Sequence, residues 1–436
     1  MKLRILHTAD WHLGQRFFDR NRQDKDQDGN EINEHQAFLD WLLLQLSQTQ
    51  ADALLVSGDV FDVRMPPSYA LEQYYNFLRQ AANICPNIII TGGNHDSAQM
   101  LNAPSNLLRY FAKIRVLGGA SDNLTDHIVE LHDRQNNLLG AVAAVPFLHD
   151  NDLYTYSPDD MHQDRSQKIK NGIKACFHEL GELMEPYQKQ NLPVIAMAHL
   201  FAAGTADEPL YEGERNTSEK EIYLGKINKD KDSDFKIGNL GIVGSEAFPD
   251  TFGYVALGHI HKPMIVNKKQ HIRYCGSPIP LSFSERDEKK QVLLVEFENA
   301  QLVNIQPLFT PVTRRLVRFK GSLDKIKSDL NTFISNKDEL PTWAEFEVLT
   351  DTYISHLDEE IKPYLPANFV PINIKQSRKN KINNLTTNAS IDNRVEDMTP
   401  EKVFLQRCAL EKISVSDEVL ETFGQLIREM NESGEL

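Results

Sequence analysis

The chain has 436 residues, of which 41% are hydrophobic and 25% charged, and it carries a formal net charge of −15 at pH 7. This composition is typical of a folded protein of two or three domains, and the sequence lacks the roughly 18-residue apolar run of a membrane-spanning helix. The acidic balance excludes a protein that coats nucleic acid through bulk charge, although carboxylates that bind cations would suit a nuclease.

Short apolar strands alternate with helical stretches through the first 300 residues. Strands are predicted at residues 3–6, 51–56, 87–90, 193–198 and 254–257, and helices at 34–46 and 68–82, where apolar side chains recur at helical spacing. This alternation predicts a layered α/β fold, in which functional residues gather at the carboxyl ends of the strands.

Polar side chains follow these five strands. The clusters are Asp10 with His12, Asp59 with Asp62, Asn94 with His95, His199, and His259 with His261. Taken singly, each has an ordinary explanation, since Gly-Gly-Asn forms turns and a histidine after a strand is commonly a hydrogen-bonded bystander. Together they offer carboxylate, amide and imidazole ligands without a cysteine, which favours Mn²⁺, Fe²⁺ or Zn²⁺. So many ligands suit two ions that share a carboxylate, an arrangement used for phosphoester hydrolysis.

The order of the motifs resembles that of the calcineurin-like metallophosphoesterases. The motifs read DWH at 10–12, GDVFD at 58–62, GNHD at 93–96, AHL at 198–200 and GHIH at 258–261. The resemblance implies a four-layer α/β/β/α metallophosphoesterase sandwich. It also implies two ligand sets that share one carboxylate: Asp10, His12, Asp59 and His261 for one ion, and Asp59, Asn94, His199 and His259 for the other.

The same resemblance assigns catalytic roles to two further residues. His95 would face the phosphate, stabilise the transition state and protonate the leaving oxygen as a general acid. Asp62 matches the acidic partner that orients this imidazole in related phosphatases, whereas Asp96 is expected to be structural. Two divalent ions, with Mn²⁺ the expected activator, would make water nucleophilic near neutral pH.

The alternation of strands and polar clusters stops beyond about residue 310, which predicts further domains. We expect a metallophosphoesterase domain at 1–305, a small α+β cap at 306–382, a linker at 383–398 and a C-terminal helical arm at 399–436. The charged segments 19–34 and 212–236 are predicted to be solvated loops. Four scattered cysteines and no recognisable secretory signal predict a cytoplasmic protein.

Basic residues gather in the predicted cap. One group comprises Lys375, Arg378, Lys379 and Lys381, and a second comprises Arg314, Arg315, Arg318 and Lys320. They are candidates for contacts with DNA phosphates, and the alternative is a solvated basic face with no ligand. The two C-terminal helices would present an apolar face that has to pack against something, either the rest of the chain or a partner.

The flanking sequence favours DNA over other phosphoesters. The chain lacks the Arg-Gly and GNHE signatures of related protein phosphatases, and its C-terminal extension is longer than a small phosphodiesterase needs. The resemblance extends to bacterial nucleases of the family. It implies 3'–5' exonuclease activity on double-stranded DNA and endonuclease activity on single-stranded or hairpin DNA, in DNA repair, recombination and replication.

Partners follow from the same resemblance. It implies a homodimer and an ABC-type ATPase partner with a long coiled coil, and because the chain has no Walker A motif, any use of ATP would belong to that partner. A metallophosphoesterase of nucleotides or other small phosphodiesters is the principal alternative. A scaffold that kept the fold without turnover is a third possibility.

Overall fold

The computed structural model describes residues 2–18, 20–25, 29–153, 165–203, 243–333, 340–366 and 368–377. The chain divides into two units, Met1–Gln376 and Ser377–Leu436, and almost all described residues belong to the first. The predicted linker at 383–398, the helical arm at 399–436 and the 212–236 segment lie outside the described residues. The same holds for Arg378, Lys379 and Lys381.

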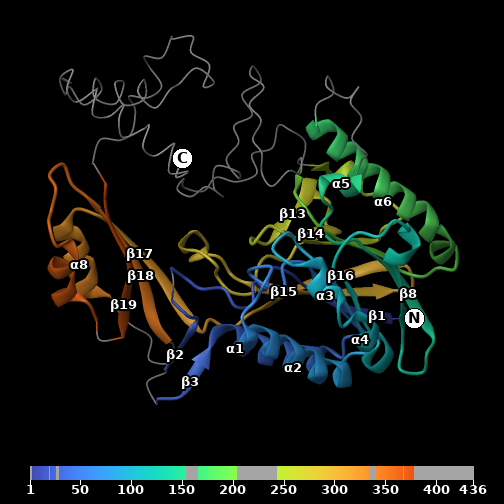
Figure 1. The fold of residues 1–436 in the computed structure, drawn as a ribbon, viewed down its shortest axis with the longest axis horizontal. Coiled ribbons are helices and arrows are strands. Elements are labelled where there is room, and N and C mark those ends of the chain that lie inside the picture. Colours follow the sequence, from blue (N-terminus) through green and yellow to red (C-terminus); the bar gives the residue numbers. More distant parts are fainter. Residues whose placement is uncertain are drawn as a thin grey trace, which may run out of the picture. The chain divides into compact units, whose positions relative to one another are not determined.

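The first sheet has six strands, of which four neighbouring ones are parallel. Its order is β16 (Gln301–Phe309), β15 (Gln291–Glu298), β1 (Lys2–Thr8), β4 (Ala53–Ser57), β5 (Asn87–Thr91) and β6 (Ile114–Leu117), and Figure 1 labels β1, β15 and β16. Strands β1, β4, β5 and β6 pair in parallel, whereas β15 and β16 are antiparallel. The parallel pairing brings the carboxyl ends of β1, β4 and β5 to one edge of the sheet.

The second sheet also has six strands. Its order is β13 (Met264–Ile265), β14 (Ile272–Tyr274), β12 (Tyr254–Gly258), β9 (Val194–His199), β8 (Leu138–Ala144) and β7 (Ile128–His132). Strands β8, β9, β12 and β14 are parallel, and in this register Gly258 lies opposite His199. The two histidine-bearing loops after β9 and β12 therefore begin side by side.

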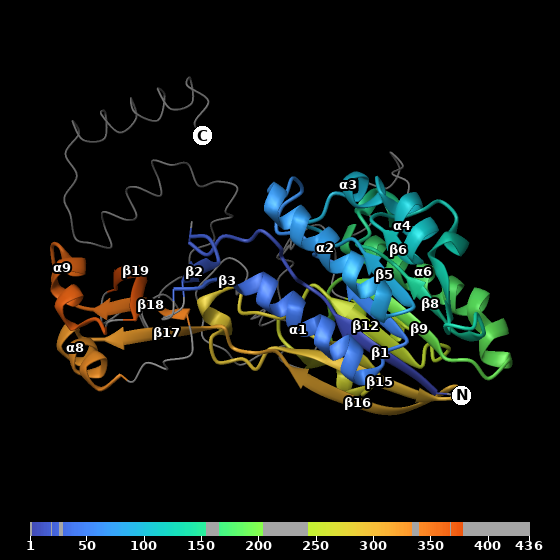
Figure 2. The same cartoon turned by 90° about the horizontal axis from the view of Figure 1, so that it is seen from below.

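Helices cover the outer face of each sheet, so the fold has four layers. One apolar core lies between each pair of adjacent layers. Helices α1 (Glu34–Thr49) and α2 (Ser68–Ile84) pack on the first sheet together with α3 (Ala98–Asn102) and α4 (Ser105–Ala112), as Figure 2 shows for α1 and α2. Helix α6 (Arg165–Lys189), preceded by α5 (Asp150–Leu153), packs on the second sheet. A third core lies between the sheets. The predicted α/β/β/α sandwich is confirmed.

Helix α1 illustrates how the sequence sets these layers. The side chain of Asn33 accepts a hydrogen bond from the Gln36 amide and so caps the first turn, and the backbone of Gln50 turns left-handed to end the helix. Phe38, Leu42 and Leu46 recur on one face and are buried against the sheet. No helix in the described ranges has both the length and the apolar character required to cross a membrane.

A small α+β cap follows β16, the edge strand of the first sheet. It consists of β17 (Arg314–Gly321), α8 (Leu323–Thr332), β18 (Leu340–Leu349), α9 (Leu357–Ile361) and β19 (Phe369–Ser377), with the strands in the order β17-β18-β19. The cap has its own aromatic core, which includes Phe319, Phe346 and Phe369. Strand β16 continues to Phe309, so the first sheet extends past the boundary predicted at residue 305.

The segment predicted as a solvated loop at 19–34 is partly structured, and one end of it is buried. Strands β2 (Gln23–Lys25) and β3 (Glu31–Asn33) form a short hairpin. Glu34 is 3% exposed and binds two arginines, Arg22 at 3.1 Å and Arg314 of the cap at 2.7 Å. The Arg314 guanidinium also lies 3.9 Å from the ring centroid of Trp343. The polar composition of the segment predicted exposure to solvent. Glu34 and Arg22 are instead buried, because their charges pair in the interior of the protein together with that of Arg314.

The buried Glu34 carboxylate is expected to stabilise the junction between the cap and the sandwich. Replacing it in Glu34→Gln removes the charge that compensates two buried guanidinium groups, so the free energy of unfolding should fall by about 3 to 5 kcal/mol. Urea denaturation followed by circular dichroism measures the change. The matched control is Glu31→Gln, which changes an exposed carboxylate that accepts a hydrogen bond from Gln23, and the expected change is within about 0.5 kcal/mol.

Candidate metal centre

The predicted ligands meet where the two sheets end. Beyond β1 and β4 the chain stays paired, because the amides of Asp10 and His12 donate to the carbonyls of Gly58 and Asp59, both at 3.0 Å. The ligand-bearing backbone is left-handed at four non-glycine residues, with φ of 54° at Asp10, 46° at His12, 49° at Asp59 and 97° at His259. Such strain persists only where the surroundings enforce it, and it concentrates at functional sites.

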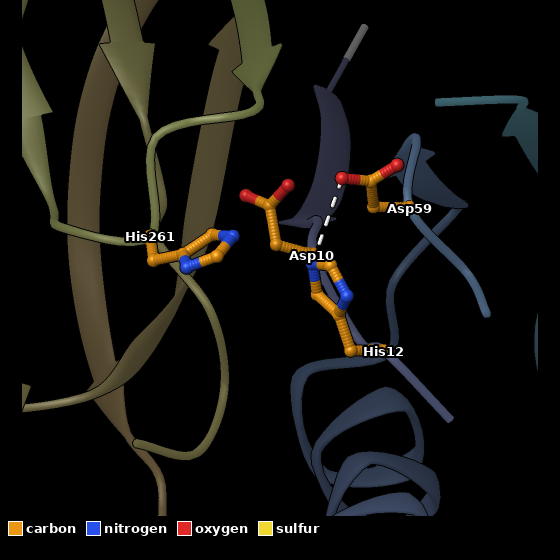
Figure 3. A group of neighbouring side chains, drawn as sticks. All are labelled: Asp10, His12, Asp59 and His261. Atoms are coloured by element: carbon orange, nitrogen blue, oxygen red, sulfur yellow. Dashed lines mark ion pairs between the residues drawn. The ribbon is translucent and has the colours of Figure 1, made fainter. Parts of the chain in front are cut away.

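The first ligand group comprises Asp10, His12, Asp59 and His261, whose candidate ligand atoms all lie within 4.8 Å of one another. Figure 3 shows a ring nitrogen of His261 turned toward the carboxylate of Asp10. On the other side, His12 Nε2 lies 3.5 Å from Asp59 Oδ2. The group therefore draws on both sheets, since His261 follows β12 and the other three residues follow β1 and β4.

The second ligand group shares Asp59 with the first. It contains His199 and His259, and its candidate ligand atoms again lie within 4.8 Å of one another. Asn94 Oδ1 lies 3.0 Å from His199 Nε2 and 2.9 Å from His259 Nδ1, so the amide oxygen belongs to the same cluster. Asp59 Oδ2 lies 3.3 Å from His199 Nε2. One carboxylate oxygen thus faces both ligand groups, the position of a bridging ligand.

Two buried atoms show that the cluster fits cations. Among the described residues, Asp10 Oδ2 and His12 Nε2 have no hydrogen-bond partner, and both atoms are shielded from solvent. The other atom of each group is engaged, because Asp10 Oδ1 accepts the His259 amide at 2.8 Å and His12 Nδ1 lies 3.1 Å from Asp62 Oδ1. Unpaired buried acceptors are costly, and a divalent ion would satisfy both. The oxygen and imidazole donors suit Mn²⁺, Fe²⁺ or Zn²⁺.

Partners on the outer side of the cluster orient the imidazole ligands. His199 Nδ1 lies 2.9 Å from the carbonyl oxygen of Ser57, and because that atom can only accept, Nδ1 carries the proton and Nε2 faces the cluster. His12 has Asp62 in the same position, and His261 Nδ1 lies 3.5 Å from Glu285 Oε1. Outer partners of this kind fix the tautomer of a ligand and raise its basicity.

The structure gives Asp62 a different partner from the one predicted. Its carboxylate bonds His12, whereas His95 Nδ1 bonds the main-chain carbonyl of Asp62 at 2.8 Å. The loops after β1 and β4 remain bridged at Leu13 and Phe61, which holds the Asp62 side chain beside His12. Because a carbonyl oxygen can only accept, Nδ1 of His95 donates this hydrogen bond, and Nε2 is the ring nitrogen that the bond leaves unengaged.

Asp96 has the structural position expected for it. Its carboxylate accepts the amides of Val60 at 3.1 Å, Phe61 at 2.9 Å and Gly93 at 2.8 Å, and so ties the loop after β5 to the loop after β4. Gly93 is required at this point, because a Cβ there would lie 2.1 Å from Asp59 Oδ1. The motif around Asn94 therefore contributes the Asp96 tether and the close packing at Gly93 in addition to a candidate ligand.

Charges inside the cluster shift the pKa values of its imidazoles in opposite directions. Burial lowers the pKa of His199, but the charge and hydrogen bond of Asp59, together with the charge of Asp10 and the Ser57 carbonyl, raise it to about 9. Burial also lowers the pKa of His261. The hydrogen bond and charge of Glu285, together with the charge of Asp10, raise this pKa to about 9. The pKa of His259 is held well below its ordinary value by burial and by the charge of His199.

Sequence reasoning gave no role to several residues that surround the ligands. Glu285 and Lys290 lie 2.5 Å apart behind His261, and the ring of Phe201 packs edge-on against His259 with a centroid distance of 4.0 Å. Glu285 is separated from its histidine by more than twenty residues and belongs to no spaced motif. Nothing in the local sequence distinguishes it from a surface carboxylate, so only the fold identifies it.

Of the predicted DNA-binding residues of the cap that the structure describes, four pair with acidic side chains of the protein. Lys375 bonds Glu345 at 3.1 Å, and Arg318 bonds the same carboxylate. Lys320 pairs with Glu347 at 3.3 Å, and Arg314 is buried in the junction with the sandwich. A groove of about 670 Å³ beside β17 and α8 is lined in part by Arg315, Lys320 and Lys325. The groove therefore gathers basic side chains of the second predicted group, Arg315 and Lys320, together with Lys325.

Two family models match the sequence. The calcineurin-like phosphoesterase model matches residues 3–263, and the model of the Type 5 capsule protein repressor C-terminal domain matches residues 312–412. The SbcD component of the nuclease SbcCD from Escherichia coli K12 is 33% identical over 95% of this chain and 95% of its own length. Its counterpart from Rhodobacter capsulatus is 33% identical over 71% of this chain and 70% of its own. A dimetal phosphatase from Danio rerio aligns with a TM-score of 0.37 and 11% identity over 71% of this chain and 99% of that one.

A cluster of carboxylate, amide and imidazole ligands at the strand ends of an α/β/β/α sandwich defines a metallophosphoesterase, an enzyme that hydrolyses phosphodiesters with divalent metal ions. The chain belongs to the calcineurin-like phosphoesterase family and, within it, to the SbcD family, whose members are components of the SbcCD nucleases.

The two possible roles of Asp62 predict different defects in Asp62→Ala. If the carboxylate orients His12, its removal should weaken Mn²⁺ binding about 10- to 100-fold. Isothermal titration calorimetry on chelator-treated protein measures this affinity. Unchanged Mn²⁺ affinity with a reduced turnover number would instead support the predicted partnership with His95.

Metal binding is expected to release protons. In chelator-treated protein at pH 7, His199 and His261 should be protonated because their pKa values are raised to about 9, and a metal ion binds only the unprotonated nitrogen. Mn²⁺ affinity should therefore rise as the pH is raised from about 6 to about 9. Calorimetry at one pH in buffers with different ionisation enthalpies counts the protons released. A binding enthalpy that does not depend on the buffer would contradict the prediction.

Proposed function

We propose that this protein is a two-metal DNA nuclease, with 3'–5' exonuclease activity on double-stranded DNA and endonuclease activity on single-stranded or hairpin DNA. The observation that carries the proposal is the shared carboxylate, Asp59, between two ligand groups in a chain that is 33% identical to the SbcD component of an SbcCD nuclease over 95% of its length. The proposed cofactor is a pair of divalent ions, with Mn²⁺ the expected activator and Fe²⁺ or Zn²⁺ the alternatives.

The proposed ligands are the seven side chains assigned from the sequence: Asp10, His12, Asp59, Asn94, His199, His259 and His261. When bound, two divalent ions would polarise the phosphate and make water nucleophilic near neutral pH. With both ring nitrogens protonated, His95 would hold the phosphate and donate the Nε2 proton to the leaving oxygen, while its Nδ1–H stays bonded to the Asp62 carbonyl and the ring is left neutral. Asp62 would act on the metal ligand His12 as a positioning residue.

DNA is proposed as the substrate, and the cap is proposed to bind its backbone. The basic groove beside β17 and α8 supports contact with phosphates, because Arg315, Lys320 and Lys325 line it. The contacts assigned to Lys375, Arg378, Lys379 and Lys381 stay predictions, as three of these residues lie outside the described part of the chain.

An SbcC-type ATPase is the proposed partner, in an SbcCD complex that acts in DNA repair, recombination and replication. The Escherichia coli relative is one component of the nuclease SbcCD, which supports a second component here, and the chain spans 95% of the length of that relative. We further propose that residues 399–436 dock this partner and that the protein forms a homodimer. A cytoplasmic location also stays a prediction.

The nuclease role of His95 can be tested on an end-labelled hairpin DNA with Mn²⁺. In His95→Ala, cleavage should fall about 100- to 10,000-fold while Mn²⁺ stoichiometry is unchanged, because the imidazole would act on the phosphate and not on the ions. His132→Ala changes a histidine on β7 outside both ligand groups and should cleave like the wild type.

A chromogenic small phosphodiester assayed in parallel separates the alternatives. Hydrolysis of this ester with intact DNA, even after an SbcC-type ATPase and ATP are added, would favour an enzyme for nucleotides or other small phosphodiesters. Binding of two ions with turnover of neither substrate would favour a scaffold without activity.

A further inference from the structure

A buried carboxylate stands behind the metal ligand that follows β12. Glu285 lies in the short 3-10 turn η5 (Phe283–Glu285) and is 7% exposed. Its two oxygens face different groups. Oε1 lies 3.5 Å from His261 Nδ1 and accepts the Ser282 hydroxyl at 3.2 Å, while Oε2 accepts the Ser277 hydroxyl and the Leu281 amide, both at 3.1 Å. The carboxylate is therefore fixed on one side and directed at the imidazole on the other.

Lys290 completes this arrangement. Its ammonium group is 2.5 Å from Glu285 Oε2 and also donates to the main-chain carbonyl of His261 at 2.9 Å and to Ser277 Oγ at 3.0 Å. The residue is 6% exposed, so these contacts are made away from water, where charge-assisted hydrogen bonds are strong. Lys290 thus holds both the carboxylate and the backbone that carries the imidazole.

The turn that carries Glu285 is itself held by the cap. Phe283, two residues earlier, is 3% exposed and packs with a centroid distance of 5.1 Å against Phe17. Phe17 in turn lies 5.1 Å from the ring of Trp343 in β18. These side chains form one apolar cluster with Leu316 of β17. The position of Glu285 is therefore fixed by packing between the sandwich and the cap as well as by its polar contacts.

We propose that Glu285, held by Lys290, is a positioning residue that directs His261 toward the ion of the first ligand group and sets the affinity of that position. The carboxylate accepts the Nδ1 proton of His261, which leaves the other ring nitrogen free toward Asp10, as in Figure 3. Both acceptor oxygens are required, since Lys290 occupies one and the imidazole the other. This inference rests on the proposed role of His261 as a ligand.

Two variants of Glu285 test the proposal. Glu285→Gln has a single acceptor oxygen, which cannot serve both Lys290 and His261. Glu285→Asp keeps the negative charge beside Lys290, but it is shorter by one methylene and cannot reach the imidazole. The matched control is Glu288→Gln, since Glu288 also pairs with Lys290, at 3.0 Å, but is not among the partners that hold the His261 ring.

The measurement is Mn²⁺ binding to the chelator-treated full chain, with no DNA present. Calorimetry gives the affinity of each position, and electron paramagnetic resonance distinguishes a coupled Mn²⁺ pair from a single ion. We expect both Glu285 variants to weaken one of two positions about 10- to 100-fold and to lose the coupled signal, with the other position unchanged. Glu288→Gln should keep both, and His261→Ala should weaken the same position.

Several outcomes would overturn the proposal. The first is an unchanged Mn²⁺ affinity in both Glu285 variants, and the second is an equal loss of Mn²⁺ affinity in Glu288→Gln. The third is a loss of Mn²⁺ affinity at both positions that follows a lowered unfolding midpoint of the variant. If Glu285→Gln fails to fold, Glu285→Asp decides, because it keeps the buried ion pair. Failure of the proposed function is distinguishable, because a wild-type protein that binds two ions but leaves DNA intact would refute the nuclease and not the role of Glu285.

Discussion

The structure depends on the Asp59 carboxylate, which is shared between two groups of ligands drawn from two different sheets. One oxygen is fixed by the amide of His95 at 3.0 Å, and the other faces both His12 and His199. The backbone of Asp59 is left-handed, and the residue is 1% exposed. A carboxylate held this tightly can serve as a bridge only if every surrounding loop takes one conformation.

The neighbouring loops meet that condition through close packing. Gly58 has no room for a side chain, because a Cβ would lie 2.2 Å from His199 Nδ1, and Gly258 would meet the carbonyl of Ser57 at 1.8 Å. Buried acceptors and left-handed backbone at the ligands cost stability, and the apolar core between the two sheets offsets this cost. The packing of these loops fixes the positions of the donor atoms and makes the folded state less stable than it would be without them, as is common at functional sites.

The cap is joined to this centre by charge as well as by apolar contacts. Arg314 reaches from the cap to Glu34 at the start of α1, and Trp343 packs through Phe17 onto the turn that carries Glu285. Other basic residues of the cap pair with Glu345 and Glu347, so the charge they offer to a nucleic acid is smaller than the sequence suggests. A local cluster of lysine and arginine therefore overstates the basic surface when acidic residues lie on the adjacent strand.

The sequence by itself determined the alternating strands and helices, the layered α/β class and the five polar clusters, because each cluster follows a strand and the carboxyl ends of parallel strands meet. The resemblance of the motifs to a known family then singled out seven candidate ligands within those clusters. It could not determine which partners orient those ligands. Asp62 faces His12 and not the predicted His95, since pairing of the loops past β1 and β4 sets the direction of its side chain. Glu285, Lys290 and the buried arginines around Glu34 were equally hidden. Their roles come from contacts between residues far apart in the chain, which composition and spacing do not encode and only the tertiary structure decides.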